Sequence, residues 1–141
     1  LVGGEDAIKV IKKIKKNNIP VILNRIHRLP KNEDSPIDSP YKQASILQEN
    51  DIMFSFSHEG DMEAMGARNL PFSAGTAVTY GLDYENAIMA LTLSTAKVLG
   101  IDHRVGSIEK GKEATFFISE GIETKYLSKA FNIVHESIRS K

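Results

Sequence analysis

The chain has 141 residues, of which 41% are hydrophobic, and its 18 Lys and Arg residues balance 18 Asp and Glu residues. This length suits one domain, and the balanced charge argues against nucleic acid or an anionic membrane as a partner. No apolar run is long enough to span a membrane. The sequence contains no cysteine, which excludes disulfides and thiolate chemistry.

The first predicted element is a strand end that runs into a helix. Residues 1–4 predict the strand end, and residues 5–17 predict a helix with Ile8, Ile11 and Ile14 on one face. The lysines of this helix predict a solvated basic face, with a nucleic-acid patch as the alternative. A chain that starts inside such a unit is expected to be a piece of a longer protein, so any signal peptide would lie upstream.

Two further strands alternate with helices. The apolar run at residues 19–23 predicts a parallel strand that is buried on both faces. A proline-containing loop over residues 29–41 and a helix over residues 42–49 lead to a third strand over residues 52–57. This alternation predicts an α/β fold with a parallel sheet and covering helices.

The next segment is mainly helical. Residues 58–66 predict a loop, and residues 69–80 predict a helix that Pro71 opens. Asp83 is a suitable N-cap for another helix, which is expected to continue towards its stop at Gly100.

The last motif covers residues 86–121, with the sequence NAIMALTLSTAKVLGIDHRVGSIEKGKEATFFISEG. Two short strands are predicted here, at residues 105–108 and 114–119, about a turn at Gly111. The motif resembles the closing signature of the metal-dependent amidohydrolase superfamily. Earlier segments extend the resemblance, and the RNLPF segment is especially similar to imidazolonepropionase-like members.

The resemblance implies how the chain is organised. Residues 1–100 would form the last βα units of a (β/α)8 TIM-type barrel, an α/β fold, and residues 101–141 would form strands of an appended β-sandwich and a tail. The tail from Gly121 onward matches the family poorly and is assigned no role. A barrel closes only with eight strands, so the chain is expected to need the missing N-terminal half, in the same or a second chain. Homo-oligomers and export are common among relatives, whereas the localisation of this protein stays unassigned.

The resemblance also implies a Zn-like divalent metal in the intact protein. Family members hold it with a His-x-His pair on the first strand, a bridging Lys or Glu, two later His and an Asp after strand eight. In this alignment the first ligands precede Leu1, the sixth-strand His falls at Gly3, and the Asp falls at Ser57-His58. No cofactor and no metal ligand is therefore assigned within this chain.

Two groups of polar residues are candidates for the site. His58, Glu59 and Asp61 are the candidate catalytic residues, because His58 could bind a metal or shuttle a proton and either acid could act as a base. The alternative is a plain polar loop at the strand exit. His27 and Arg28 follow the second strand and are candidate substrate-binding residues, with an ordered surface loop as the alternative.

The implied function is hydrolysis of a non-peptide or dipeptide-like C–N bond in a small-molecule substrate. The alternative is a degenerate, non-catalytic amidohydrolase homologue, a pseudoenzyme that serves as a binding or structural subunit. The 141-residue chain alone is expected to be inactive, because it holds only part of the barrel.

Overall fold

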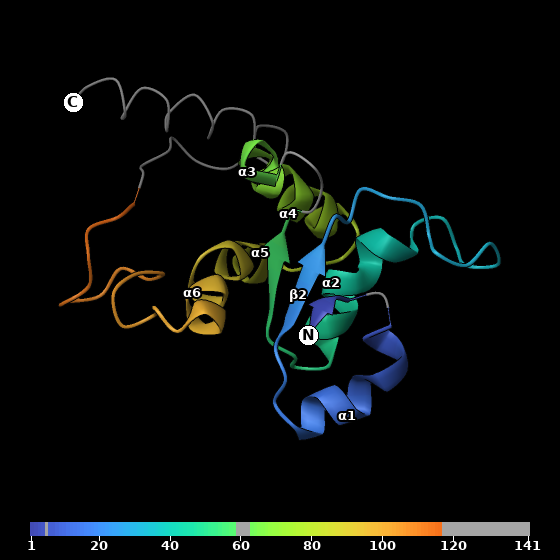
Figure 1. Ribbon diagram of the computed structural model, residues 1–141, viewed down its shortest axis with the longest axis horizontal. Coiled ribbons are helices and arrows are strands. Elements are labelled where there is room, and N and C mark those ends of the chain that lie inside the picture. Colours follow the sequence, from blue (N-terminus) through green and yellow to red (C-terminus); the bar gives the residue numbers. More distant parts are fainter. Residues whose placement is uncertain (5, 59–62, 117–141) are drawn as a thin grey trace.

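A computed structural model of the chain describes residues 1–4, 6–58 and 63–116. Three parallel strands form its sheet in the order β1-β2-β3: β1 (Val2–Gly3), β2 (Val21–Asn24) and β3 (Phe54–Ser57). The helices lie around this sheet (Figure 1). The predicted α/β fold with a parallel sheet is therefore confirmed.

Helical crossovers join the strands. The 3-10 helix η1 (Ile8–Val10) and helix α1 (Ile11–Lys16) lead from β1 to β2, and α2 (Ser39–Glu49) leads from β2 to β3. The first crossover is shorter than the predicted helix over residues 5–17, and no side-chain cap stabilises its start. Helix α2 begins three residues earlier than predicted, because Pro40 occupies its first turn, where the missing N–H costs no hydrogen bond.

A series of helices follows β3. They are α3 (Glu63–Gly66), the 3-10 helix η2 (Ala67–Asn69), α4 (Leu70–Thr79), α5 (Tyr84–Leu91) and α6 (Leu93–Leu99). The predicted loop over residues 58–66 is thus wrong at its end, where α3 forms, whereas the helix opened by Pro71 is confirmed. Among the described residues, no helix is long and apolar enough to cross a bilayer.

The predicted caps of the last helical segment are confirmed, but its continuity is not. The Asp83 carboxylate accepts the backbone N–H of Asn86 at 3.2 Å, and Gly100 ends α6 with a φ of +71°. One helix up to Gly100 was expected, yet the backbone breaks at Thr92, with φ −123° and ψ −91°. The hydroxyls of Thr92 and Thr95 donate to carbonyls of α5, and such bonds compete with a regular helix.

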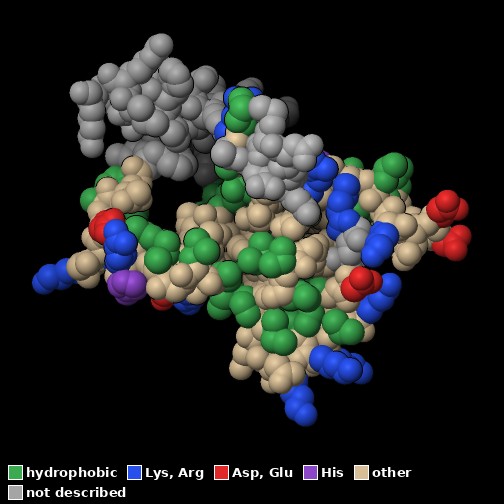
Figure 2. Space-filling model, viewed as in Figure 1, with side chains coloured by type: hydrophobic (Ala, Val, Ile, Leu, Met, Phe, Trp, Pro, Cys, Tyr) green, Lys and Arg blue, Asp and Glu red, His purple; other side chains and the backbone are tan. Residues whose placement is uncertain are grey.

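The core lies between one face of the sheet and the helices. Val21, Leu23, Phe54 and Phe56 alternate with the residues of the other face, and each is at most 5% exposed. Alanines of α4 and α5 pack in the same cluster, so small side chains let these helices approach the strands. On the other face, Val2 is 64% exposed, and Figure 2 shows hydrophobic side chains gathered at the centre of the molecule, where the strands of Figure 1 lie.

Residues 101–116 contain neither helix nor strand. The strand expected at residues 105–108 is therefore wrong, and that expected at 114–119 is absent as far as residue 116; the rest of it lies outside the described residues. Gly106 and Gly111 have φ of +100° and +96°, which interrupt an extended run. A backbone hydrogen bond from Glu113 N to Arg104 O at 2.8 Å joins the residues that directly precede the two expected strands, whereas a hairpin needs a ladder of such bonds. The division into domains at residue 100 stays a prediction.

Candidate functional site at the carboxyl ends of the strands

The carboxyl ends of the three strands form one edge of the sheet. The register pairs Gly3 with Leu23 and Asn24 with Ser57, so these strand ends lie at nearly the same level. The backbone N–H of Arg25 continues the contact with the carbonyl of Ser57 at 3.4 Å. This edge is where a parallel α/β sheet carries its site. Asn24 also lies at this edge and becomes a further candidate site residue. In the sequence it stands at the end of an apolar run, and its side-chain Oδ1 atom is buried.

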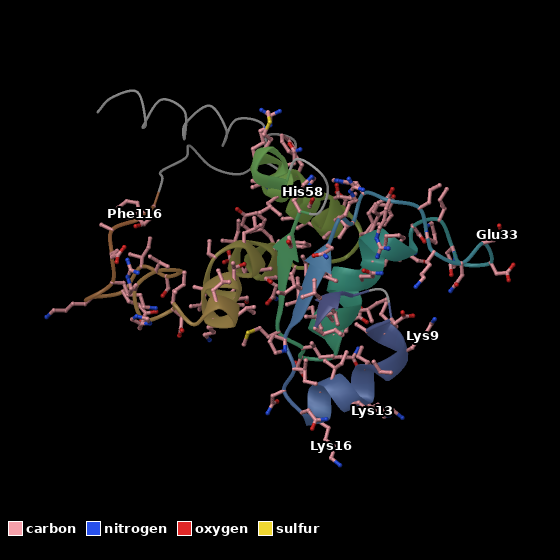
Figure 3. The ribbon with its side chains drawn as sticks, in the orientation of Figure 1. Lys9, Lys13, Lys16, Glu33, His58 and Phe116 are labelled. Carbon is pink, nitrogen blue, oxygen red and sulfur yellow. The ribbon has the colours of Figure 1, made fainter. Side chains whose placement is uncertain are left out.

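The imidazole of His58 lies against helix α3, directly after β3 (Figure 3). It is half-buried. A Cβ atom built on Gly66 would collide with Cδ2 and Nε2 of the His58 ring. Only a glycine at this point of α3 therefore leaves room for the ring, and the packing holds the imidazole beside the strand ends. The other two candidate catalytic residues, Glu59 and Asp61, lie outside the described residues, and the catalytic role of all three stays a prediction.

The end of β1 offers space but no side chain. Gly3 has a φ of +108°, and a Cβ built on it would meet no atom within 4 Å. Gly4 has a φ of +76°, and its Cβ would lie 2.5 Å from Cδ2 of Leu23. The Gly3-Gly4 pair thus lets the chain turn closely over the core, and it places no ligand at the position where the resemblance implies a histidine.

His27 connects the loop after β2 to helix α4. Its Nε2 atom lies 2.8 Å from Oγ1 of Thr76, which itself donates to the carbonyl of Phe72 at 3.0 Å. Because the hydroxyl proton is used in that second bond, Nε2 of His27 must be the donor. The Tyr41 ring lies beside the imidazole, with ring centroids 6.2 Å apart. One ring nitrogen of His27 is therefore committed to holding the loop.

Arg28 is less exposed than a residue at a substrate entrance is expected to be. Its side chain is half-buried, and its Nε and Nη2 atoms are shielded from solvent. Substrate binding by His27 and Arg28 stays a prediction, and the structure gives both residues contacts within the chain as well.

The described residues do not fit a metal centre by themselves. Within residues 1–4, 6–58 and 63–116, no group of three or more His, Cys, Asp or Glu side chains is placed to hold a metal ion. At the strand ends, Gly3, Asn24 and Ser57 are not the nitrogen, thiolate or carboxylate ligands that zinc prefers, and His58 alone is of that kind. What this edge offers chemically is one positioned imidazole next to amide and hydroxyl groups.

Comparison with known proteins identifies relatives over most of the chain. Residues 2–138 match the model of the amidohydrolase family. The match includes most of the tail after Gly121, so the expectation that this tail matches the family poorly is wrong. A stretch of 54 residues is 43% identical to an imidazolonepropionase from Syntrophobacter fumaroxidans, and it covers 38% of this chain and 13% of that protein. An amidohydrolase structure from Thermotoga maritima MSB8 superposes on 90% of this chain and 32% of its own, with a TM-score of 0.68 at 24% identity. The chain thus spans about a third or less of the length of these relatives.

We predict that Thr76→Val loosens the loop after β2. The substitution removes the acceptor of the His27 N–H, and loss of such a bond costs about 1 kcal/mol in the free energy of unfolding. Thr79→Val is the matched control, because Thr79 makes the same type of hydroxyl bond within α4, to Gly75 at 3.1 Å, and none to a histidine in the described residues. Urea unfolding measures both variants, and equal destabilisation would contradict the role given to His27.

We also predict that Gly66→Ala displaces the imidazole of His58. The added methyl group occupies the volume of the ring, and such overpacking costs about 1–3 kcal/mol. The measurement is the shift of the His58 ring resonances in an NMR spectrum. Ala67→Ser adds one atom at the neighbouring exposed residue and should leave these resonances in place; a His58 signal that Gly66→Ala does not move would rule out the packing.

Proposed function

The chain belongs to the amidohydrolase family, and on this premise we propose that it is the C-terminal part of a (β/α)8 barrel hydrolase. Its intact form would cleave a non-peptide or dipeptide-like C–N bond in a small molecule. Three parallel strands in sequence order, each joined to the next by a helix, are what a segment of such a barrel requires. Residues 1–100 would be barrel, and residues 101–141 would form strands of the appended sandwich and the C-terminal tail.

The observation that carries the proposal is the position of His58 at the strand ends. Hydrolysis of a C–N bond needs a group that removes a proton from water and a group that protonates the departing nitrogen. Imidazole suits proton transfer near neutral pH, and the packing of this ring on Gly66 holds it beside the end of β3. His58 would be the proton-transfer group that this part of the protein contributes, and Glu59 or Asp61 would assist it as a base.

The rest of the site would come from the missing N-terminal half of the barrel, in the same polypeptide or in a second chain. Members of the family usually carry divalent metals, whose chemistry is to lower the pKa of a bound water. Because the described residues of this chain lack a metal cluster, the ligands for a Zn-like ion would belong to that half. His27 and Arg28 would line the substrate entrance, and a homo-oligomer is the expected assembly.

A second candidate function is a non-catalytic homologue that serves as a binding or structural subunit. Gly3 favours it, because this residue stands without a side chain, at a φ of +108°, where the family has a histidine. The hydrolase requires His58 to transfer a proton and requires a bound metal, whereas the non-catalytic homologue requires neither.

We predict that His58→Gln lowers kcat by about 10²–10⁴-fold in the protein that contains the whole barrel, because an amide cannot transfer the proton. The substrates to assay are cyclic amides and dipeptides, and KM should change little. His103→Gln is the control, since His103 is an exposed residue of the segment after α6. Equal kcat values for the two variants would exclude His58 from proton transfer.

The metal content of the same protein distinguishes the two candidates. Stoichiometric Zn, Mn or Fe supports the hydrolase, and persistent absence of bound metal after metal loading supports the non-catalytic homologue. The 141-residue chain alone should show no turnover, because it lacks the other half of the site. Metal-dependent amide hydrolysis by this chain alone would contradict that division of the site.

A further inference from the structure

The loop after β2 carries two large apolar side chains that nothing in the described part of the chain covers. We call residues 29–38 the β2 loop. Leu29 is 74% exposed and Ile37 is 71% exposed. The loop is held in shape by contacts of its own, such as the 2.6 Å hydrogen bond that Oγ of Ser39 donates to the carbonyl of Pro36. Apolar side chains on a preformed loop suit a protein interface, because little conformational entropy is lost when they bind.

The missing half of the proposed barrel does not lie next to this loop. β2 is the central strand of the sheet, with β1 on one side and β3 on the other. The strands of the missing half would pair with the outer edges of β1 and β3, because a barrel closes at its free edges. The neighbours of the β2 loop around the barrel end are therefore the segments that follow β1 and β3, and both belong to this chain. Cover for the apolar side chains of the loop would come from another molecule.

The tip of the β2 loop is acidic, whereas one side of helix α1 is basic. Glu33 and Asp34 are exposed in the loop, and Lys12, Lys13 and Lys16 are exposed on α1, where spacings of three and four residues place them on one side. Among the described residues, none of these five has an ion-pair partner. Figure 3 shows Lys13 and Lys16 pointing away from the body of the molecule and Glu33 at the outer end of the loop. Each copy thus presents two separate surfaces of opposite charge.

We propose that two copies of the chain associate through these surfaces, with the β2 loop of each copy against α1 of the other. Around a two-fold axis each copy gives both its loop and its helix, so the same contact forms twice. Glu33 and Asp34 would face the lysines of α1, and Leu29 and Ile37 would be covered beside them. The opposite charges steer the approach and fix the register, and the apolar side chains supply a desolvated centre.

The presence of both surfaces in one chain favours a second copy over an unrelated partner. The proposal rests on the homo-oligomer that the proposed function expects, and it gives that assembly a defined surface. It does not depend on the catalytic role of His58.

The first test reverses the charge of each surface in the protein that contains the whole barrel. One variant carries Glu33→Lys and Asp34→Lys, and the other carries Lys13→Glu and Lys16→Glu. Each variant places like charges across both contacts of the dimer. We therefore expect its dimer dissociation constant, measured by analytical ultracentrifugation, to rise by at least about tenfold.

The matched control for the basic surface is Lys97→Glu with Lys110→Glu. Both are exposed lysines outside the two surfaces, and Lys97 lies in the last turn of α6 as Lys13 and Lys16 lie in the last turn of α1. The control changes the net charge by the same amount and should leave the dissociation constant unchanged. An equal effect of the control and of Lys13→Glu with Lys16→Glu overturns the proposal.

Mixing the two reversed variants gives the sharpest measurement. One variant is acidic on both surfaces and the other is basic on both, so the mixture should form a heterodimer although neither variant dimerises well alone. Association on mixing also shows that both variants are folded. Variants that dimerise like the unaltered protein, or that fail to associate when mixed, overturn the proposal, as does an unaltered protein that is monomeric.

Salt tests the unaltered protein. Raising the ionic strength from about 0.1 M to about 1 M shortens the Debye length from about 10 Å to about 3 Å, so the dimer dissociation constant should rise several-fold. A constant that does not rise overturns the proposal in favour of another, apolar interface. A monomer that binds double-stranded DNA, and loses this binding in Lys13→Glu with Lys16→Glu, overturns it in favour of nucleic acid. All these experiments measure mass or binding rather than turnover, so their failure leaves the proposed hydrolase function untouched.

Discussion

The pairing of β2 with β3 is the constraint on which the rest of the structure depends. Four residues of each strand lie in register, from Val21 beside Phe54 to Asn24 beside Ser57. A slip of one residue would turn the buried side chains to the opposite face of the sheet. The burial of Val21, Leu23, Phe54 and Phe56 therefore fixes the register, and the register fixes the level at which the polar strand ends meet. The site is in this sense a consequence of the core.

Much of this fold can be predicted from the sequence, because the core strands appear as apolar runs between helical patterns. The predicted burial of β2 on both faces is wrong, however, since Val21 and Leu23 are buried whereas Ile22 is only half-buried. The end of α6 is also visible, since Gly100 adopts the positive φ of +71° that a glycine stop implies. The break at Thr92 is not visible, because a threonine is compatible with a helix until its hydroxyl bonds to the carbonyl of Ile88 at 2.8 Å. In the loop after α6, by contrast, the sequence predicts strands that do not form. Its residues alternate as in a strand, but the chain turns at Gly106 and packs on Ala96.

The candidate site is less predictable, because its contacts join residues that are far apart in the chain. The sequence places His27 and His58 after strands, but it does not reveal that His27 bonds to Thr76 in α4, 49 residues later. The sequence does not reveal Asn24 as a site residue, because it ends an apolar run that predicts only core side chains. Glu59 and Asp61 lie outside the described residues, so for these two candidates the sequence remains the whole basis of the prediction.

Two glycines give the strand-end edge its character, and they act in opposite ways. Gly66 makes room for the imidazole of His58, because any Cβ at this position would enter the ring. Gly3 leaves its surroundings open, yet its φ of +108° is one that residues with a side chain rarely adopt. A ligand at position 3 would therefore require the end of β1 to change its backbone as well as its side chain. The open surroundings of Gly3 and the space that Gly66 leaves for the His58 ring are thus independent features of the backbone, so a change at one of these positions need not alter the other.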